Sequence, residues 1–175
     1  MRVIAGQLGG RSFDSPHGSR THPMSDKVRG GLFNTLGNIE SLTLLDAFAG
    51  SGALSYEALS RGVASAIAID IDIKAYNAMK KNVEALGLTK RLKIIRANSS
   101  GWSDNNPDQT FNIVIAAPPY DDLQLPIVRK LTKHVQPGGL FVLDWPGSEE
   151  QPEFTDFEQV ADRQYGDAQL VFYRS

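Results

Sequence analysis

The chain has 175 residues, of which 41% are hydrophobic and 22% charged, and its formal net charge is −2. This composition is typical of one globular domain and excludes disordered, collagen-like and membrane-spanning classes. The absence of cysteine, the three scattered histidines and the lack of an apolar stretch at the start exclude disulfides, a zinc site and a signal peptide, so we expect a metal-free, cytoplasmic protein.

Residues 1–37 are expected to form a small appendage within a single domain that spans residues 1–175. Two short segments, 3–5 and 11–13, flank three glycines and predict a β-hairpin. Apolar side chains on one face of residues 26–36 predict a helix, which Ser25 or Asp26 can cap and Gly37 can end.

This first segment is also basic. Residues 1–30 carry five Lys and Arg against two acids, whereas residues 144–175 carry eight acids against two arginines. A basic arm on an acidic body predicts a face for a polyanion, because phosphate contacts dominate nucleic-acid affinity. The alternative is an unevenly charged, solvated surface. The candidate RNA contacts are Arg11, Arg20, Lys27 and Arg29.

From Thr43 onward, expected strands alternate with expected helices. The strands are Thr43–Phe48, Ala64–Ile69, Leu92–Ala97, Phe111–Ala116 and Leu140–Leu143, and the helices are Ala53–Arg61, Ile73–Leu86 and Asp122–His134. This alternation predicts an α/β fold with a doubly wound, mostly parallel sheet. Two late strands, near Phe157–Ala161 and Ala168–Tyr173, would form an antiparallel hairpin at the C-terminus and bring the sheet to seven strands.

The first of these strands ends in residues suited to a nucleotide-like ligand. Gly50 and Gly52 form a turn before a helix, although such a turn alone is more often only a turn. Asp46 adds a carboxylate at the end of the strand. Asp70 ends the second strand, where an acid reaches ribose hydroxyls; the alternative role, a helix N-cap, fits Asp72 better.

The same residues favour S-adenosylmethionine over NAD as the cofactor. A dinucleotide fingerprint needs a third glycine where this chain has Ser55. A carboxylate such as Asp46 would repel a pyrophosphate but attract the ammonium of S-adenosylmethionine.

The fourth strand ends in Ala117, Pro118, Pro119 and Tyr120. Two consecutive prolines fix a rigid loop, because they can continue neither a helix nor a central strand. The ring of Tyr120 offers a surface on which a base can stack. The alternative is a sturdy turn with a core tyrosine.

Several stretches together resemble the family of methyltransferases that modify the exocyclic N2 amine of a guanine in 16S ribosomal RNA. The resemblance runs over nearly the whole chain, and the Pro-Pro-Tyr triplet alone is shared with many amino-group methyltransferases. The matching stretches are Arg2–Gly6 with Gly10–Arg11, Thr21–Arg29, Leu32–Asn34, Leu45–Leu54, Glu57–Gly62, Pro118–Tyr120 and Tyr165–Gly166, of which Phe48–Leu54 with Glu57–Gly62 are the most specific.

The resemblance implies a role for each matching site residue. Pro118 and Tyr120 would position the guanine, and the basic N-terminal hairpin would dock on RNA. The candidate cofactor contacts are Asp46, Gly50 and Gly52 for the methionine part, Asp70 for the ribose, Asn98 for the adenine, and also Phe48 and Ile71.

Two positions depart from the family pattern. Ala117 stands where the family carries Asp or Asn before Pro-Pro-Tyr, and loss of one preorganised partner can reduce a rate by about 10²–10³-fold. The Pro118 carbonyl can still accept a hydrogen bond, and Asp121 is a second candidate acceptor. Asn98 replaces an Asp and keeps an acceptor oxygen.

The leading hypothesis is therefore a monomeric methyltransferase that acts on ribosomal RNA or the small ribosomal subunit, with Ala117, Pro118 and Tyr120 at the reaction site. One alternative is a catalytically impaired relative that binds S-adenosylmethionine and RNA, for which Ala117 is the motivating feature. Another is an N-methyltransferase that acts on a different amine.

Overall fold

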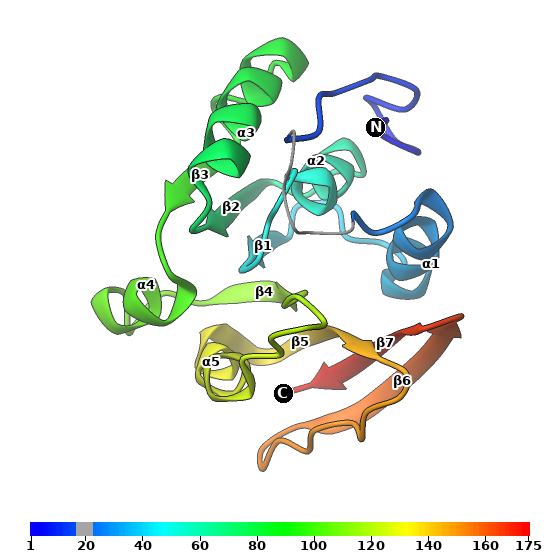
Figure 1. Ribbon diagram of the computed structural model, residues 1–175, viewed down its shortest axis with the longest axis vertical. Helices are drawn as coiled ribbons and strands as arrows, with labels where there is room; N and C mark the ends of the chain where they lie inside the picture. Colours follow the sequence, from blue (N-terminus) through cyan, green and yellow to red (C-terminus); the bar gives the residue numbers. More distant parts are fainter. Residues whose placement is uncertain (17–22) are drawn as a thin grey trace.

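The computed structural model describes residues 1–16 and 23–175, so Arg20 lies outside the described residues. Seven strands form one sheet in the order β3-β2-β1-β4-β5-β7-β6 (Figure 1). The elements in chain order are α1 (Asp26–Leu36), β1 (Thr43–Asp46), α2 (Ala53–Ser60), β2 (Ser65–Asp70), α3 (Ile73–Leu86), β3 (Leu92–Arg96), α4 (Ser99–Asn105), β4 (Phe111–Ala116), α5 (Leu125–Leu131), the 3₁₀ turn η1 (Thr132–His134), β5 (Val135–Pro146), β6 (Glu158–Tyr165) and β7 (Ala168–Arg174).

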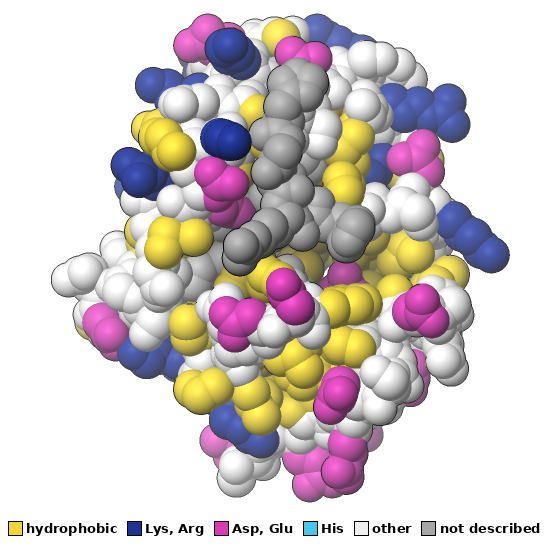
Figure 2. All heavy atoms as spheres, viewed as in Figure 1, with side chains coloured by type: hydrophobic (Ala, Val, Ile, Leu, Met, Phe, Trp, Pro, Cys, Tyr) yellow, Lys and Arg dark blue, Asp and Glu magenta, His cyan; other side chains and the backbone are white. Residues whose placement is uncertain are grey.

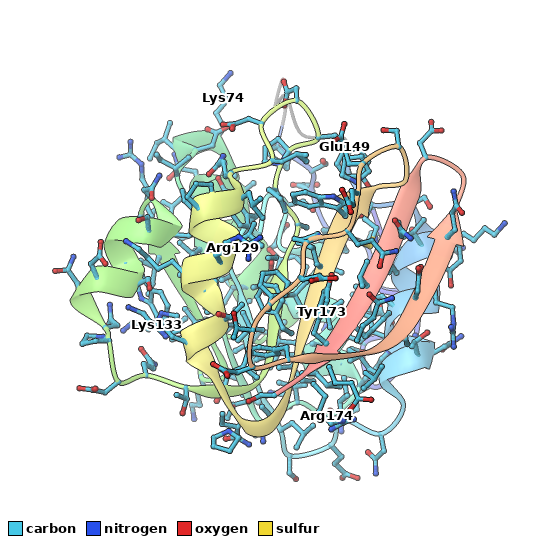
Figure 3. All side chains as sticks on the ribbon, turned by 90° about the horizontal axis from the view of Figure 1, so that it is seen from below. Lys74, Arg129, Lys133, Glu149, Tyr173 and Arg174 are labelled. Atoms are coloured by element: carbon cyan, nitrogen blue, oxygen red, sulfur yellow. The ribbon has the colours of Figure 1, made fainter. Side chains whose placement is uncertain are left out.

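The fold class predicted from the sequence is confirmed. Strands β1 to β5 pair in parallel, and β7 lies between β5 and β6 and is antiparallel to both. Helices α1, α2 and α3 pack on one face of the sheet, and α4 and α5 lie side by side on the other (Figures 1 and 3). The described part of the chain has no helix that is long and apolar enough to cross a membrane.

The helix boundaries follow from local capping chemistry. The Ser25 side chain accepts a hydrogen bond from the Val28 amide and begins α1, and Gly37 ends that helix with a φ of 72°. In α3, Asp72 is the N-cap and accepts from the Lys74 amide, as the sequence favoured, while Gly87 is the left-handed C-cap. These caps satisfy backbone groups that a helix end leaves unpaired.

The structure corrects three of the predicted elements. Residues 99–105 form helix α4, which the sequence analysis missed because the segment is short, rich in Ser and Asn, and weakly apolar. The helix expected over 122–134 is confined to α5 and η1, because the irregular turn at 119–124 precedes it. Strand β5 is longer than expected and contains the bulge at Gly138, whose φ is 77°.

The predicted N-terminal hairpin is reduced to a single bridge between Arg2 and Ser12, with a few further backbone hydrogen bonds. A regular ladder does not form because the amides of Ile4 and Ala5 donate instead to the carboxylate of Glu57, at 2.7 and 3.1 Å. The arm is therefore held by helix α2 rather than by its own strand pairing.

The Glu57 carboxylate is completely buried and also forms ion pairs with two arginines. Arg61 donates to it at 2.7 Å, and the Arg29 guanidinium lies 4.0 Å away, itself fully buried. Arg29 donates further to the Arg2 carbonyl at 2.7 Å and to Asp26 at 3.0 Å. Glu57 thus joins the arm, α1 and α2 in one buried polar cluster.

Replacement of Glu57 by alanine should destabilise the fold by about 3–5 kcal/mol, because it leaves two backbone amides and Arg61 without their acceptor and removes one of the two carboxylates beside the buried Arg29. Chemical denaturation measures the loss, and amide hydrogen exchange at Ile4 and Ala5 reports release of the arm. Glu84→Ala, at an exposed position of α3, is the matched control and should change stability little. Unchanged exchange at Ile4 and Ala5 would contradict the anchoring role.

Candidate functional site

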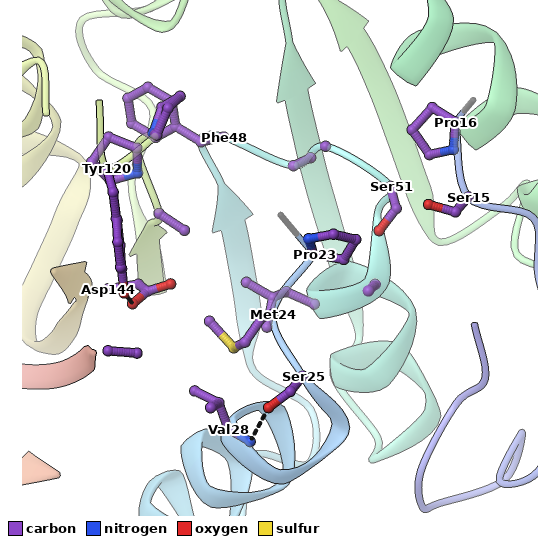
Figure 4. A pocket seen from close by; sticks show the side chains of 18 of the residues that line it. Ser15, Pro16, Pro23, Met24, Ser25, Val28, Phe48, Ser51, Tyr120 and Asp144 are labelled. Carbon is purple, nitrogen blue, oxygen red and sulfur yellow. Dashed lines mark hydrogen bonds between the residues drawn. The ribbon is translucent and has the colours of Figure 1, made fainter. Parts of the chain in front are cut away.

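A pocket of about 460 Å³ opens at the carboxyl edge of the sheet, between the loops that follow β1 and β4. These two strands are neighbours at the centre of the sheet, where the strand order reverses. Ligands bind at this switch point in doubly wound folds. Part of the N-terminal segment closes the opposite side with Ser15, Pro16, Pro23, Met24 and Val28 (Figure 4).

Most of the expected reaction-site residues meet in this pocket. Ala117, Pro118, Pro119 and Tyr120 line it from the loop after β4, together with Phe48 from the loop after β1. Tyr120 is 42% exposed, and its ring stands across the pocket from Met24 (Figure 4). A planar group can therefore enter between an aromatic and a thioether side chain, both of which favour contact with flat rings.

Asp144, near the end of β5, also lines this pocket, and the sequence analysis missed it. The Tyr120 hydroxyl donates a hydrogen bond of 2.6 Å to its Oδ1 (Figure 4). Burial raises the pKa of Asp144 to about 6, while the bond from Tyr120 acts in the opposite direction. A polar residue at the carboxyl end of the strand next to β4 was the signal that could have identified it.

The glycine turn after β1 is held by a carboxylate beneath it. The Gly50 amide donates to Asp70 Oδ2 at 2.7 Å, and the Asp72 amide donates to Asp70 Oδ1 at 2.8 Å. Burial raises the pKa of Asp70, and these backbone donors oppose that effect. Asp70 therefore fixes the position of Gly50, which lines the pocket with a φ of 52°.

Gly52 is required by the packing of the protein's own core. A side chain there would meet the Tyr56 hydroxyl at 2.5 Å and Met79 at 3.1 Å, and its φ is 81°. Gly52 lets helix α2 begin directly after the turn.

Asp46 lies at the end of β1 and is completely buried rather than in the wall of the pocket. Its Oδ2 accepts a bond of 2.8 Å from the Ser55 hydroxyl, whereas its Oδ1 has no hydrogen-bond partner among the described residues. Burial, and to a smaller extent the charge of Asp70, raises the pKa of Asp46 to about 7. An orphaned acceptor of this kind fits a site that pairs with a cationic ligand group.

The other candidate cofactor contacts lie along the same edge of the sheet but outside this pocket. Ile71 follows β2 and is 64% exposed, although it is a large apolar side chain. Asn98 does not end β3 but caps α4, where its side chain accepts from the Ser100 amide at 2.8 Å. Asp70, Ile71 and Asn98 therefore surround the exposed ends of β2 and β3.

These residues fit S-adenosylmethionine in their chemistry. Asp46 offers an unpaired acceptor for an ammonium, Asp70 a carboxylate for ribose hydroxyls, and Ile71 an exposed apolar side chain for an adenine. The described residues that line the neighbouring pocket include no Lys or Arg side chain that could bind a phosphate.

The three candidate RNA contacts among the described residues are not equivalent. Arg29 is 0% exposed and engaged in the Glu57 cluster, so the expectation that it contacts RNA was wrong. Arg11 is exposed, but it donates to the Ala85 carbonyl at 2.5 Å at the end of α3. Lys27 is exposed on the first turn of α1. Figure 2 shows many acidic side chains at the end of the molecule where β6 and β7 lie.

Comparison with known proteins gives consistent matches. The chain matches the family described as conserved hypothetical protein 95 over residues 1–174. It is 33% identical to YlbH of Bacillus subtilis, over 99% of this chain and 98% of that protein. It is 36% identical to the ribosomal RNA small subunit methyltransferase D of Escherichia coli strain K12, over 69% of this chain and 60% of that protein.

Solved structures show the same architecture. The yhhF protein from Escherichia coli superposes with a TM-score of 0.86 at 28% identity and covers 99% of this chain and 97% of its own. The structure of SMU.776 complexed with SAH has a TM-score of 0.70 at 14% identity, over 85% of this chain and 48% of that one. The second likeness concerns the fold alone.

Replacement of Asp46 by asparagine should have opposite effects on stability and on cofactor binding. The raised pKa means that the folded state loses stability as the pH rises from about 4 through 7, so a neutral side chain should gain up to about 4 kcal/mol at pH 8 and less at pH 5. Loss of the charge should weaken S-adenosylmethionine binding about 10-fold or more.

Denaturation at the two pH values and calorimetric titration with the cofactor measure both effects. Asp108→Asn, at an exposed position, is the control and should alter neither. A variant that binds the cofactor as tightly as the parent chain would remove Asp46 from the binding site.

Proposed function

The chain belongs to the family described as conserved hypothetical protein 95, with the ribosomal RNA small subunit methyltransferase D proteins among its relatives, and from this premise we propose that it methylates the exocyclic N2 amine of a guanine in 16S ribosomal RNA. The cofactor is S-adenosylmethionine. In this proposal the protein is a cytoplasmic monomer that acts on ribosomal RNA or on the small ribosomal subunit.

One observation carries the proposal: the loop containing Pro118 and Tyr120 and the loop containing Gly50 line the same pocket. A base stacked on Tyr120 would lie next to the turn that holds the cofactor, and such stacking contributes about 1–3 kcal/mol per base. The base has to leave its helix or be unpaired already, because an enzyme that modifies a base acts on it outside the stack.

The chemistry needs a positioned amine more than an acid or a base. S-adenosylmethionine supplies a methyl group on a sulfonium: the amine lone pair forms the N–C bond, the S–C electron pair returns to sulfur, and the nitrogen releases one proton. The lone pair of a guanine amine is delocalised into the ring. A carbonyl such as that of Pro118 can accept a hydrogen bond from the amine, and rigid placement supplies much of the acceleration.

The basic N-terminal segment supports RNA as the substrate. Arg2 and Lys27 are exposed on the side of the pocket formed by α1, and Arg11 is exposed at the end of α3. Strands β6 and β7, which belong to the acidic stretch 144–175, form the opposite end of the sheet from β3 and α3 (Figure 1). RNA would therefore approach over α1 and α3, where phosphates meet cations.

The first test is transfer of a labelled methyl group from S-adenosylmethionine to undermethylated small ribosomal subunits, with the product nucleoside identified. We expect N2-methylguanosine. Tyr120→Ala should reduce kcat/KM by roughly 10–100-fold through loss of stacking. Absence of label with the cofactor bound would favour the impaired relative, and label in a protein or a different nucleoside would favour another amine.

Lys27→Glu should weaken binding of the RNA substrate and reduce the salt dependence of binding by about one counterion or more, with the cofactor affinity unchanged. Filter binding across a salt series measures both quantities. Lys90→Glu, at an exposed position on the opposite edge of the sheet, carries the same charge change and should have a smaller effect. Equal effects of the two variants would argue against a defined RNA face.

A further inference from the structure

The loop after β4 lacks the side-chain acceptor that its sequence pattern leads one to expect, because residue 117 is alanine. A guanine amine has two hydrogens, and the Pro118 carbonyl can accept only one of them in a given pose. The pocket therefore needs a second acceptor within reach of the same amine if it is to localise the nitrogen lone pair.

The neighbouring strand supplies a carboxylate at the matching level of the sheet. Ala116 of β4 pairs with Leu143 of β5, so the next residues, Ala117 and Asp144, lie side by side across the two parallel strands. Neighbouring strands are about 4.8 Å apart. Side chains alternate between faces along a strand, and both Ala117 and Asp144 line the pocket.

The contacts of Asp144 leave it able to accept a further hydrogen bond. The Tyr120 hydroxyl donates to Oδ1 at 2.6 Å, and this is the one side-chain bond to Asp144 within the described part of the chain. A carboxylate has about four acceptor positions on two oxygens. The bond from Tyr120 also fixes the carboxyl group at the hydroxyl end of the ring on which a base would stack (Figure 4).

Asp121 is the other carboxylate in the lining of the pocket, and it is the weaker candidate. It is exposed on the irregular turn after Tyr120, where water competes for its oxygens. Asp144 is partly buried on a strand and held by a hydrogen bond, so its position is defined before a substrate enters.

We propose that Asp144 replaces the missing side chain of residue 117 as the acceptor for the target amine. A carboxylate on β5 then accepts the hydrogen bond that a side chain in the loop after β4 was expected to accept. This inference rests on the proposed function. In it, one amine hydrogen bonds to the Pro118 carbonyl and the other to Asp144, which accepts the proton that the nitrogen releases and passes it to solvent.

Because the proposed role of Asp144 requires an ionised carboxylate, the rate of methyl transfer should depend on pH. Asp144 is ionised at pH 8, and it becomes protonated as the pH falls through about 6, which removes its acceptor role. The titratable side chains lining the pocket with it are Tyr120 and Asp121, and Asp167 acts on Tyr120 from the β6–β7 turn. Methyl transfer should therefore decline below about pH 6.

The test moves the carboxylate from residue 144 on β5 to residue 117 after β4. Asp144→Ala should reduce kcat for methyl transfer by about 10²–10³-fold with little change in cofactor affinity. The double variant Asp144→Ala with Ala117→Asp should recover at least 10-fold of that loss, because it returns a carboxylate to the neighbouring position. Asp156→Ala removes an exposed carboxylate that does not line the pocket, and it should retain the parent rate.

Two more conservative variants distinguish the acceptor role of Asp144 from a purely structural role. Asp144→Asn keeps the size of the side chain and should abolish the decline near pH 6. Tyr120→Phe keeps the ring but removes its bond to Asp144, which should move that decline to higher pH. A merely structural Asp144 would move neither pH profile.

The outcomes separate this inference from the proposed function. If the parent chain forms no N2-methylguanosine, the proposed function fails. If the parent chain is active and Asp144→Ala, with its fold and cofactor affinity intact, keeps the parent rate, the function stands and the role of Asp144 is overturned. Loss of activity without recovery in the double variant and without a change in the pH profile of Asp144→Asn would also overturn it.

Discussion

The central position of β1 is the constraint on which the site depends. This strand pairs in parallel with β2 on one side and with β4 on the other, so the chain must leave it and β4 at the same edge of the sheet. The connection from β1 passes to α2 on one face, whereas the chain after β4 passes to α5 on the other. The two loops diverge, and the pocket lies between them.

The fold completes this pocket with a segment that the sheet itself does not require. Glu57 of α2 binds the amides of residues 4 and 5 and lies against the buried Arg29 of α1. It thereby fixes α1 so that Val28, and Met24 before it, face the Pro-Pro-Tyr loop. The site therefore depends on a buried charge cluster that does not itself line the pocket but holds Met24, whose carbonyl accepts a hydrogen bond from Arg29. A buried charge that lacks its partner is energetically costly, so such a cluster favours the one arrangement of the helices in which its charges are paired.

The electrostatic character of the site is acidic in its described parts. Asp46 and Asp70 lie beneath the glycine turn, and Asp144 lies at the hydroxyl end of Tyr120. Burial raises the pKa of all three carboxyl groups. A cationic cofactor suits such surroundings, whereas a pyrophosphate does not. The exposed cations of the N-terminal segment, Arg2, Arg11 and Lys27, do not line this acidic pocket.

The sequence by itself determined the alternation of elements, the parallel sheet with its antiparallel end and the two functional loops, because apolar periodicity and glycine and proline positions are local signals. It could not place Arg29 correctly, because this side chain is buried beside Glu57, 28 residues further along the chain. Nor could it show that Gly52 packs closely against Tyr56. Asp144 became a site residue only through the register of β4 with β5. Register and burial are set by contacts between distant segments, which only the tertiary structure decides.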